Sequence, residues 1–345
     1  MIDLRSDTLT LPDAAMLQSI LTAPLGDDGR LNAEGRGEDA TVNLLEDRAA
    51  ALTGKEAALL CCSGTMGNQA ALLTYCRPGD CALIDELQHL DRSEKTGFDP
   101  RFGQLKKVTY RADASGMPDL ADMEEKLKNN PVKVICIENT HNYLGGTCID
   151  LKRMAEIRAL ADRYGVPVHM DGARAFNAAA WLGVSIAELA QYVDSLMFCV
   201  SKGLGAPVGS LLCGTRDFIR AAKDTRKLMG GAMRQAGIIA APALYALEHN
   251  VERLKEDNEN SRLCASLLAD MKKLKAQKNV QTNIMMVDTA GSGITPQELC
   301  GRAKERGLLI RPIIGSFVRL VFYKGITRDM AVEAAQILKA IDAEL

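Results

Sequence analysis

The amino-acid sequence predicts an α/β fold: a large domain with a mostly parallel seven-stranded sheet, followed by a smaller α+β domain. Short, β-prone apolar runs alternate with helical patterns from about residue 55 onward. Several of these runs are continuously apolar, as expected for strands that helices cover on both faces. After about residue 240 this alternation gives way to a different mixture of elements.

The expected strands and the helices between them account for most of the first 240 residues. Helical patterns include 66–76, 119–128 and 152–164. The charged, Gly-rich stretch 26–39 has no apolar period and is expected to form a loop, of a length that is often functional. The expected strands are 57–62, 81–87, 106–112, 132–138, 166–171, 195–200 and 208–213.

A long helical pattern over 237–273 begins the C-terminal part of the chain. Strands and helices then mix in a way that is typical of an α+β domain. We therefore expect a large domain over 1–240, which includes an N-terminal segment 1–25, and a small domain over 241–345. The later elements are strands 283–289, 308–312 and 317–323 and helices 296–306 and 327–343.

Composition and charge argue against several classes of function. The net charge of -2 and the pI near 6.2 give no sign of a nucleic-acid or anionic-membrane partner. The N-terminus is charged from its third residue, so neither a signal peptide nor a membrane span is expected. Most of the ten cysteines lie in apolar runs, among them Cys61, Cys62, Cys136 and Cys199, which indicates a reducing cytosol. We therefore expect a cytoplasmic protein. Because the sequence contains no CxxC pair, we expect no metal site.

Lys202 is the first candidate for chemistry. It lies in FCVSKGLGAPVGS, beyond the carboxyl end of the expected strand 195–200, which is where ligands bind in open α/β sheets. A lone lysine on a Gly-rich turn is more often a solvated surface residue. Groups at two other strand ends favour a functional role.

These two strand ends complement a pyridoxal phosphate (PLP) cofactor. The segment 63–69, SGTMGNQ, offers N–H groups and hydroxyls at a helix N-terminus, where a phosphate can bind. Asp171, in HMDGAR, needs a cationic partner, which the protonated pyridine nitrogen of PLP supplies. Helix capping or pairing with Arg174 would also explain Asp171. Together the three features predict PLP bound to Lys202 as a Schiff base.

Seven stretches of the sequence carry a family resemblance. They are DLRSDT (3–8), GEDATVNLLE (37–46), GKEAALLCCSGTMGNQ (54–69), ENTHN (138–142), HMDGARAFNAA (169–179), FCVSKGLGAPVGS (198–210) and RKLMGGAMRQAG (226–237). In this order they resemble the L-threonine aldolases of the β-eliminating lyase group, which are fold type I PLP enzymes. The resemblance thins after residue 240.

For the cofactor, the resemblance implies that Lys202 forms the Schiff base and that Asp171 pairs with the pyridine nitrogen. Gly64 and Thr65 would hold the phosphate, and Arg174 is expected beside the same cofactor. All of these residues lie in the matching stretches.

For the substrate, the resemblance implies that Ser6, Arg174 and Arg319 hold the α-carboxylate, whose orientation paired guanidinium donors would fix. His89 would stack on the PLP ring near the substrate hydroxyl. His141, in ENTHN, would line the same pocket.

Two basic residues of RKLMGGAMRQAG point to self-association. Lys227 and Arg234 resemble groups that the family offers to the phosphate of a neighbouring subunit. A homodimer with shared active sites is therefore implied, and the family commonly forms a dimer of dimers, a homotetramer.

The remaining histidines are expected to be structural. His169 comes before Asp171 on the same expected strand, and we expect it to point to the opposite face of the sheet and to serve packing. His249, in the later helical pattern, is expected at the surface. A metal site made of His169, Asp171 and cysteines fails on spacing.

The chain departs from the family's pattern only near the expected substrate side-chain pocket. The cofactor residues are intact, so the cofactor prediction is firmer than the substrate prediction. The departures are Arg36 in place of Tyr after an insertion in 29–35, Ser93 in place of an aromatic residue before Glu94, Thr96-Gly97 in place of paired glycines, and Tyr323 in place of His.

The resemblance implies cleavage of a β-hydroxy-α-amino acid, such as threonine or allo-threonine, to glycine and an aldehyde. His89, or a water that it holds, would accept the proton of the β-hydroxyl group. The departures leave open a β-eliminating lyase, a transaldolase or a racemase with the same lysine anchor. A non-catalytic PLP-binding module is a further alternative, against which the intact Lys202, Asp171 and carboxylate clamp argue.

Overall fold

The computed structural model describes residues 1–113 and 116–345. Its centre is a seven-stranded sheet with the strand order β2-β8-β7-β6-β5-β3-β4, in which β8 runs in the opposite direction to the other six strands. All seven predicted strands are confirmed. They are β2 (Ala57–Cys61), β3 (Cys81–Asp85), β4 (Lys106–Tyr110), β5 (Val132–Glu138), β6 (Val168–Asp171), β7 (Ser195–Cys199) and β8 (Ser210–Gly214).

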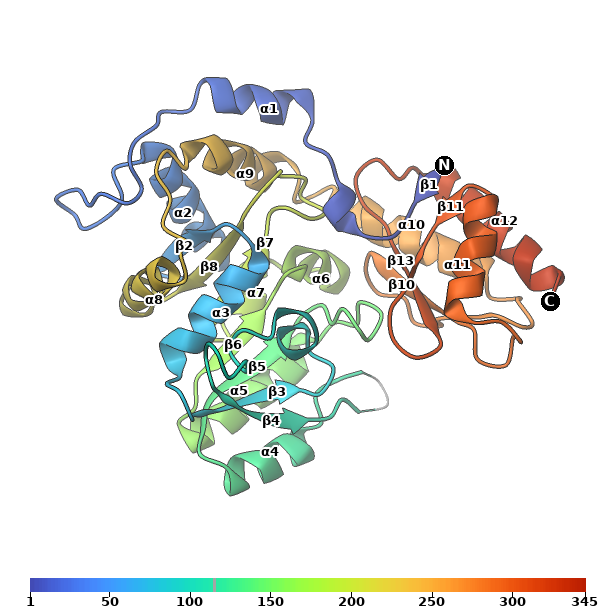
Figure 1. Ribbon diagram of the computed structural model, residues 1–345, viewed down its shortest axis with the longest axis horizontal. Helices are drawn as coiled ribbons and strands as arrows, with labels where there is room; N and C mark the ends of the chain where they lie inside the picture. Colours follow the sequence, from blue (N-terminus) through green and yellow to red (C-terminus); the bar gives the residue numbers. More distant parts are fainter. Residues whose placement is uncertain (114–115) are drawn as a thin grey trace.

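Helices cover both faces of this sheet, because alternate strand residues enter two different hydrophobic clusters. Leu60 packs toward one layer of helices, and Leu59 packs toward the other. The first layer contains α2 (Ala40–Thr53), α4 (Leu120–Asn129), α5 (Leu151–Tyr164), α6 (Ala175–Leu182), α7 (Ile186–Ala190) and α9 (Gly237–His249), with α1 (Ala14–Leu21) outside α9. The second contains α3 (Gly64–Tyr75), α8 (Arg216–Leu228) and a π-helical turn, Leu90–Glu94 (Figure 1).

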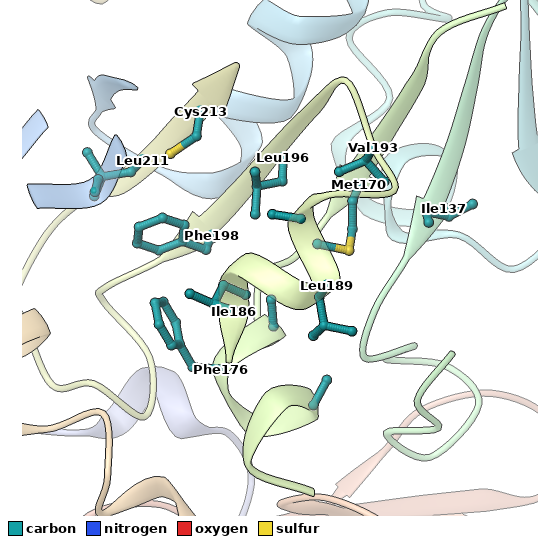
Figure 2. Packing of buried hydrophobic residues seen from close by; sticks show 14 of the residues in the cluster. Ile137, Met170, Phe176, Ile186, Leu189, Val193, Leu196, Phe198, Leu211 and Cys213 are labelled. Atoms are coloured by element: carbon teal, nitrogen blue, oxygen red, sulfur yellow. The ribbon is translucent and has the colours of Figure 1, made fainter. Parts of the chain in front are cut away.

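The core of the first layer packs α6 and α7 against the middle of the sheet (Figure 2). Phe176 of α6 meets Phe198 of β7 edge to face, with ring centroids 5.2 Å apart, a favourable geometry for two aromatic rings. Cys61, Cys136 and Cys199 are buried as predicted. Cys62 is exposed instead, because it directly follows the last residue of β2.

The predicted helix over 237–273 is two helices, α9 and α10 (Leu254–Leu267). The break between them is tied to the turn that follows Lys202. Asn250 Nδ2 donates to the carbonyl oxygen of Leu204 at 2.7 Å, and Arg253 donates to that of Gly203 at 3.1 Å. These bonds satisfy carbonyl groups of the turn, so the interruption of the helix supports the segment that carries Lys202.

A second hydrophobic cluster forms beside the large sheet, on the right of Figure 1. Its four-stranded antiparallel sheet has the order β12-β13-β10-β9. The elements are α10, α11 (Pro296–Glu305), α12 (Arg328–Ala343), β9 (Lys275–Ala276), β10 (Ile284–Asp288), β12 (Arg311–Pro312) and β13 (Phe317–Val321). The predicted strand 308–312 is two short strands, of which β11 (Leu308–Leu309) leaves this sheet to pair with the N-terminal β1 (Ile2–Asp3).

The N-terminal residues connect the two parts of the molecule. Ile2 and Leu4 belong to the second hydrophobic cluster, whereas the first cluster continues along the chain to Leu254. The expected boundary between residues 240 and 241 falls within α9. Among the described residues, no helix is long and apolar enough to cross a membrane.

Candidate active site

A cavity of about 200 Å³ lies where the strands β3, β5, β6 and β7 end. Since these four strands are parallel, their carboxyl ends share one edge of the sheet. Six of the predicted site residues line the cavity. The full lining is Ser6, Thr8, His89, Ser93, Glu138, Asn142, Tyr143, Asp171, Ala173, Arg174, Lys202, Arg311, Ile313 and Arg319.

Lys202 projects into this cavity from the turn after β7. The residue is half-buried, and its side chain forms neither a hydrogen bond nor an ion pair within the described residues. Its charge helps to lower the pKa of Asp7, so the two groups are close in space. A lysine without a partner at a cavity wall is available to react with a carbonyl group.

Asn68 of α3 joins two carboxylates beside the cavity. Its Nδ2 donates to Asp171 Oδ2 and to Glu94 Oε1, each at 2.9 Å. An amide nitrogen can only donate, so Oδ1 must be the accepting end of this side chain. Asp171 ends β6, is buried, and has no basic partner in the part of the chain that the structure describes.

His169 is bonded into the same network. Because Oδ1 of Asn68 accepts, His169 Nε2, 3.1 Å away, carries the proton, and Nδ1 accepts from Ser195 Oγ at 2.9 Å. Ser195 accepts in turn from Tyr75 at 3.0 Å. Burial lowers the pKa of His169 to about 4, so the ring is neutral near pH 7. The predicted packing role is wrong: His169 lies two residues before Asp171 on β6 and therefore shares its face of the sheet.

His89 and Glu94 form a second pair at the cavity. His89 Nδ1 lies 3.0 Å from Glu94 Oε1, and the backbone N–H of His89 donates to Glu138 at 2.8 Å. Burial opposes protonation of His89, but the hydrogen bond to Glu94 and the nearby carboxylates raise its pKa above the ordinary value. Within the described residues Nε2 of His89 has no hydrogen bond, so it can serve a ligand in the cavity.

Arg174 is held by Asp7 in a two-pronged ion pair. Its Nε and Nη2 donate to the two carboxylate oxygens at 2.6 and 2.7 Å. Burial favours the neutral carboxyl, but Arg174, Lys202 and Arg319 outweigh it and lower the pKa of Asp7 to about 2. The remaining nitrogen of the fork, Nη1, has no hydrogen bond within the described residues and can bind an anion.

Arg319 lies beside Arg174 with only neutral partners. It donates to Asn142 Oδ1 and to the carbonyl oxygen of Arg5, while its buried Nε has no partner in the described part of the chain. Burial, followed by repulsion from Arg174, lowers the pKa of Arg319 to about 10. Two adjacent guanidinium groups with one carboxylate between them favour binding of a further anion.

The chain matches the model of the family described as beta-eliminating lyase over residues 3–292. It is 38% identical over 340 residues to the low specificity L-threonine aldolase of Escherichia coli (strain K12), covering 97% of both chains. It is 36% identical over 336 residues to low-specificity L-threonine aldolase 1 of Arabidopsis thaliana, covering 94% of this chain and 92% of that one. The chain belongs to the β-eliminating lyase family. The family is PLP-dependent, which confirms the predicted cofactor and the predicted class of enzyme.

The fold of this β-eliminating lyase family member is also that of a solved relative. The structure of the Leishmania major threonine aldolase aligns with a TM-score of 0.81 at 17% identity, covering 99% of this chain and 100% of that one. The predicted fold type I architecture, with a large mostly parallel sheet and a smaller second part, is therefore confirmed.

The cavity fits the PLP of this family on observations of the structure itself. Asp171 is a buried carboxylate that lacks a cation among the described residues, and a pyridinium nitrogen would supply one. Gly64 begins α3, where a Cβ atom would come within 2.8 Å of Cys199 Sγ, so only glycine allows this close approach. Thr65 follows in the first turn, with its side chain exposed at the helix N-terminus.

Besides Gly64 and Thr65, three of the predicted residues lie outside the cavity. His141 does not line it, contrary to expectation, because its ring is buried behind the wall with Nε2 3.2 Å from Asp85 Oδ1. Lys227, at the end of α8, is exposed. Arg234 is also exposed and pairs with Asp27 of the loop 26–39 at 3.2 Å.

His89, Glu94 and Asp171 could also be mistaken for a metal site, since their ligand atoms lie within 4.8 Å of one another. Each carboxylate, however, accepts from Asn68, and Glu94 also holds His89 Nδ1. We therefore interpret the group as a hydrogen-bonded network. Asn68, the centre of this network, is not among the residues predicted from sequence, although it lies in the SGTMGNQ segment predicted to bind phosphate.

Proposed function

We propose that this β-eliminating lyase family member cleaves a β-hydroxy-α-amino acid of the threonine kind to glycine and an aldehyde. The observation that carries the proposal is the convergence, in one cavity, of an unpaired Lys202, the buried Asp171 and a pair of arginines. The names of the relatives, which are L-threonine aldolases, support the same substrate class.

In this proposal Lys202 Nζ anchors PLP, and Asp171 holds the proton on the ring nitrogen. Bound PLP supplies an electron sink for the pair of electrons released when a bond to Cα breaks. Gly64 and Thr65 bind the phosphate at the N-terminus of α3, where the backbone N–H groups and the helix dipole favour an anion. Arg174 lies beside the cofactor as part of the cavity wall.

The substrate carboxylate binds to Ser6, Arg174 Nη1 and Arg319. Asp7 prevents Arg174 from rotating because it occupies the other two donors of the fork. A carboxylate held in a fixed orientation would decide which bond of Cα is cleaved. We infer that these residues select the Cα–Cβ bond.

His89 is the group that accepts the proton of the β-hydroxyl as the Cα–Cβ bond breaks, directly or through a water. Its free Nε2 faces the cavity residues, while Glu94 holds Nδ1 and stabilises the charged ring that results. His141 has no direct part in this step and instead supports the wall through Asp85.

We also propose how the chain is organised and assembled. The small domain begins after α9 and includes the N-terminal residues Ile2 and Leu4, since these share its hydrophobic cluster. Lys227 and Arg234 are exposed and serve the phosphate of a neighbouring subunit, which makes the active unit a homodimer or a dimer of such dimers. The composition favours the cytoplasm as its location.

Product analysis tests the proposed reaction. The PLP-loaded protein is incubated with L-threonine and L-allo-threonine, and the proposal expects glycine and acetaldehyde in equal amounts. Formation of 2-oxobutanoate and ammonia would establish β-elimination instead, and inversion at Cα without cleavage would establish a racemase. Lys202→Ala, incubated in parallel, should yield neither set of products.

A further inference from the structure

We propose that Arg311 forms a subsite for a second carboxylate, on the substrate side chain, so that β-hydroxy-α-amino dicarboxylic acids such as 3-hydroxyaspartate are the preferred substrates. This inference rests on the proposed aldol cleavage and names its substrate class. It is carried by the position of Arg311, its lack of a partner and the charges around it.

Arg311 is placed at the cavity by the register of two strands. It lies on β12, and its partner in the antiparallel ladder is Arg319 on β13. Residues directly opposite each other in such a ladder project from the same face, and both arginines line the cavity. Arg319 is buried, whereas Arg311 is exposed.

Neither arginine of this pair has an ion-pair partner among the described residues, although the carboxylate of Asp7 acts on Arg319 from its pair with Arg174. Within the described residues the side chain of Arg311 has no hydrogen bond or ion pair, and the partners of the Arg319 side chain are neutral oxygens of Asn142 and Arg5. Arg311 adds to the effects of burial and Arg174 that lower the pKa of Arg319 to about 10. Like charges opposite each other in a sheet are destabilising, so the arrangement favours the arrival of anions.

Apart from Lys202 and Asp171, which the proposed function assigns to PLP, the other carboxylates at the cavity already have their partners. The carboxylate of Asp7 is occupied by the fork of Arg174, and Glu138 accepts the backbone N–H groups of His89 and Asn142. Under the proposed function Asp171 faces the cofactor ring. The substrate α-carboxylate then pairs with Arg319, and the charge of Arg311 is left to bind one further anion.

Two hydroxyl groups lie together at the cavity wall. Ser93 Oγ and Tyr143 OH lie 3.1 Å apart, and both residues line the cavity together with Arg311. Ser93 occupies one of the positions at which this chain departs from its family's pattern. Hydroxyls and a guanidinium suit a polar, anionic side chain better than a methyl group.

Cleavage of 3-hydroxyaspartate is balanced as an aldol reaction. The Cα–Cβ bond breaks, the β-hydroxyl loses its proton as its oxygen becomes a carbonyl oxygen, and Cα gains a proton. The products are glycine and glyoxylate, and neither an oxidant nor a reductant is required.

The experiment compares kcat/KM for 3-hydroxyaspartate and for threonine in the PLP-loaded wild type and in Arg311→Gln. We expect the wild type to prefer 3-hydroxyaspartate, and Arg311→Gln to lower kcat/KM for this substrate by roughly tenfold to a hundredfold, the loss of one charge-assisted contact. Its kcat/KM for threonine should remain close to the wild-type value, which also shows that the variant is folded. Arg311→Lys should be intermediate, because lysine keeps the charge but not the fork.

Lys304→Gln is the matched control. Lys304 is an exposed cation on α11 outside the cavity, so its loss should leave the ratio between the two substrates unchanged. Equal losses for both substrates in Arg311→Gln, or a wild type that prefers threonine, would overturn the subsite. A change of oligomeric state in Arg311→Gln with unchanged selectivity would overturn it too, by assigning Arg311 to a subunit contact. If the wild type cleaves neither substrate, the proposed function itself fails.

Discussion

His169 Nε2 lies 3.1 Å from Asn68 Oδ1, and this one contact fixes the direction of a buried hydrogen-bond chain. The chain runs from Tyr75 through Ser195 and His169 to Asn68, whose amide then donates to the carboxylate of Asp171. Asn68 Nδ2 also donates to Glu94, so rotation of the Asn68 amide or the His169 ring would leave a buried polar atom unsatisfied.

Replacement of His169 by Phe should weaken cofactor binding although residue 169 does not touch the cavity. The variant leaves Asn68 Oδ1 without a donor. The amide is then no longer fixed in the orientation in which Nδ2 donates to Asp171. An unsatisfied buried group costs about 1–3 kcal/mol, which corresponds to roughly a fivefold to hundredfold rise in the Kd of PLP. The Kd is measured by absorbance titration of the apoprotein.

Ser195→Ala is the matched change at the other nitrogen of the same ring. It keeps the His169–Asn68 bond, so its effect on the Kd of PLP should be smaller than that of His169→Phe. Equal Kd values in the wild type and both variants would show that the chain has no influence on Asp171.

Stability should fall in acid because His169 is buried in its neutral form. Its pKa in the folded protein is about 4, against an ordinary value of 6.5. Between these values the unfolded chain binds the proton more tightly, so the free energy of unfolding decreases as the pH falls from 6.5 toward 4, by about 3 kcal/mol in total from this group. Urea unfolding between pH 7.5 and 4 measures the slope, which should be shallower in His169→Phe. Parallel slopes in the two proteins would contradict the buried neutral histidine.

The acid limb of the pH–rate profile should depend on Glu94. Its hydrogen bond raises the pKa of His89 against the effect of burial, and His89 must be neutral to accept a proton. Glu94→Gln should therefore move the acid limb of kcat/KM to lower pH. His89→Asn should lower cleavage while the absorbance of bound PLP is retained. Full cleavage in His89→Asn would remove His89 from the mechanism.

Asp7→Ala should reduce both stability and substrate affinity. It leaves Arg174 as a buried charge without its carboxylate, at a cost of about 3–5 kcal/mol in the free energy of unfolding. The free guanidinium loses its orientation, so KM should rise as well. Asp270→Asn, which breaks the exposed pair with Lys339, is the control and should alter neither quantity measurably. An Asp7→Ala protein as stable as the wild type would show that the ion pair is dispensable.

The sheet and the cavity edge were predictable from sequence because they depend on local patterns. Short β-prone runs, several of them continuously apolar, mark all seven strands, and Lys202 and Asp171 stand where two of those strands end. The face of the sheet predicted for His169 is wrong, because residues two positions apart along a strand project from the same face. Its role still required the structure, since its partners Asn68 and Ser195 come from α3 and β7.

Contacts between distant segments explain the other errors. The helical pattern of 237–273 continues through residues 250–253. The helix is nevertheless interrupted there, where the side chains of Asn250 and Arg253 donate to carbonyl groups of the 203–204 turn, some fifty residues earlier in the chain. The ENTHN motif predicts that His141 lines the pocket, whereas in the structure its ring contacts Asp85 behind the cavity wall. Such bonds leave no periodic signal in the sequence.

The covalent bond between PLP and Lys202 is tested most directly by peptide mapping after borohydride reduction of the holoenzyme, which makes the linkage permanent. We expect a single PLP-modified peptide that contains Lys202, and no modified peptide from Lys202→Ala. A PLP adduct on another lysine, or an unmodified Lys202 in cofactor-loaded protein, would contradict it.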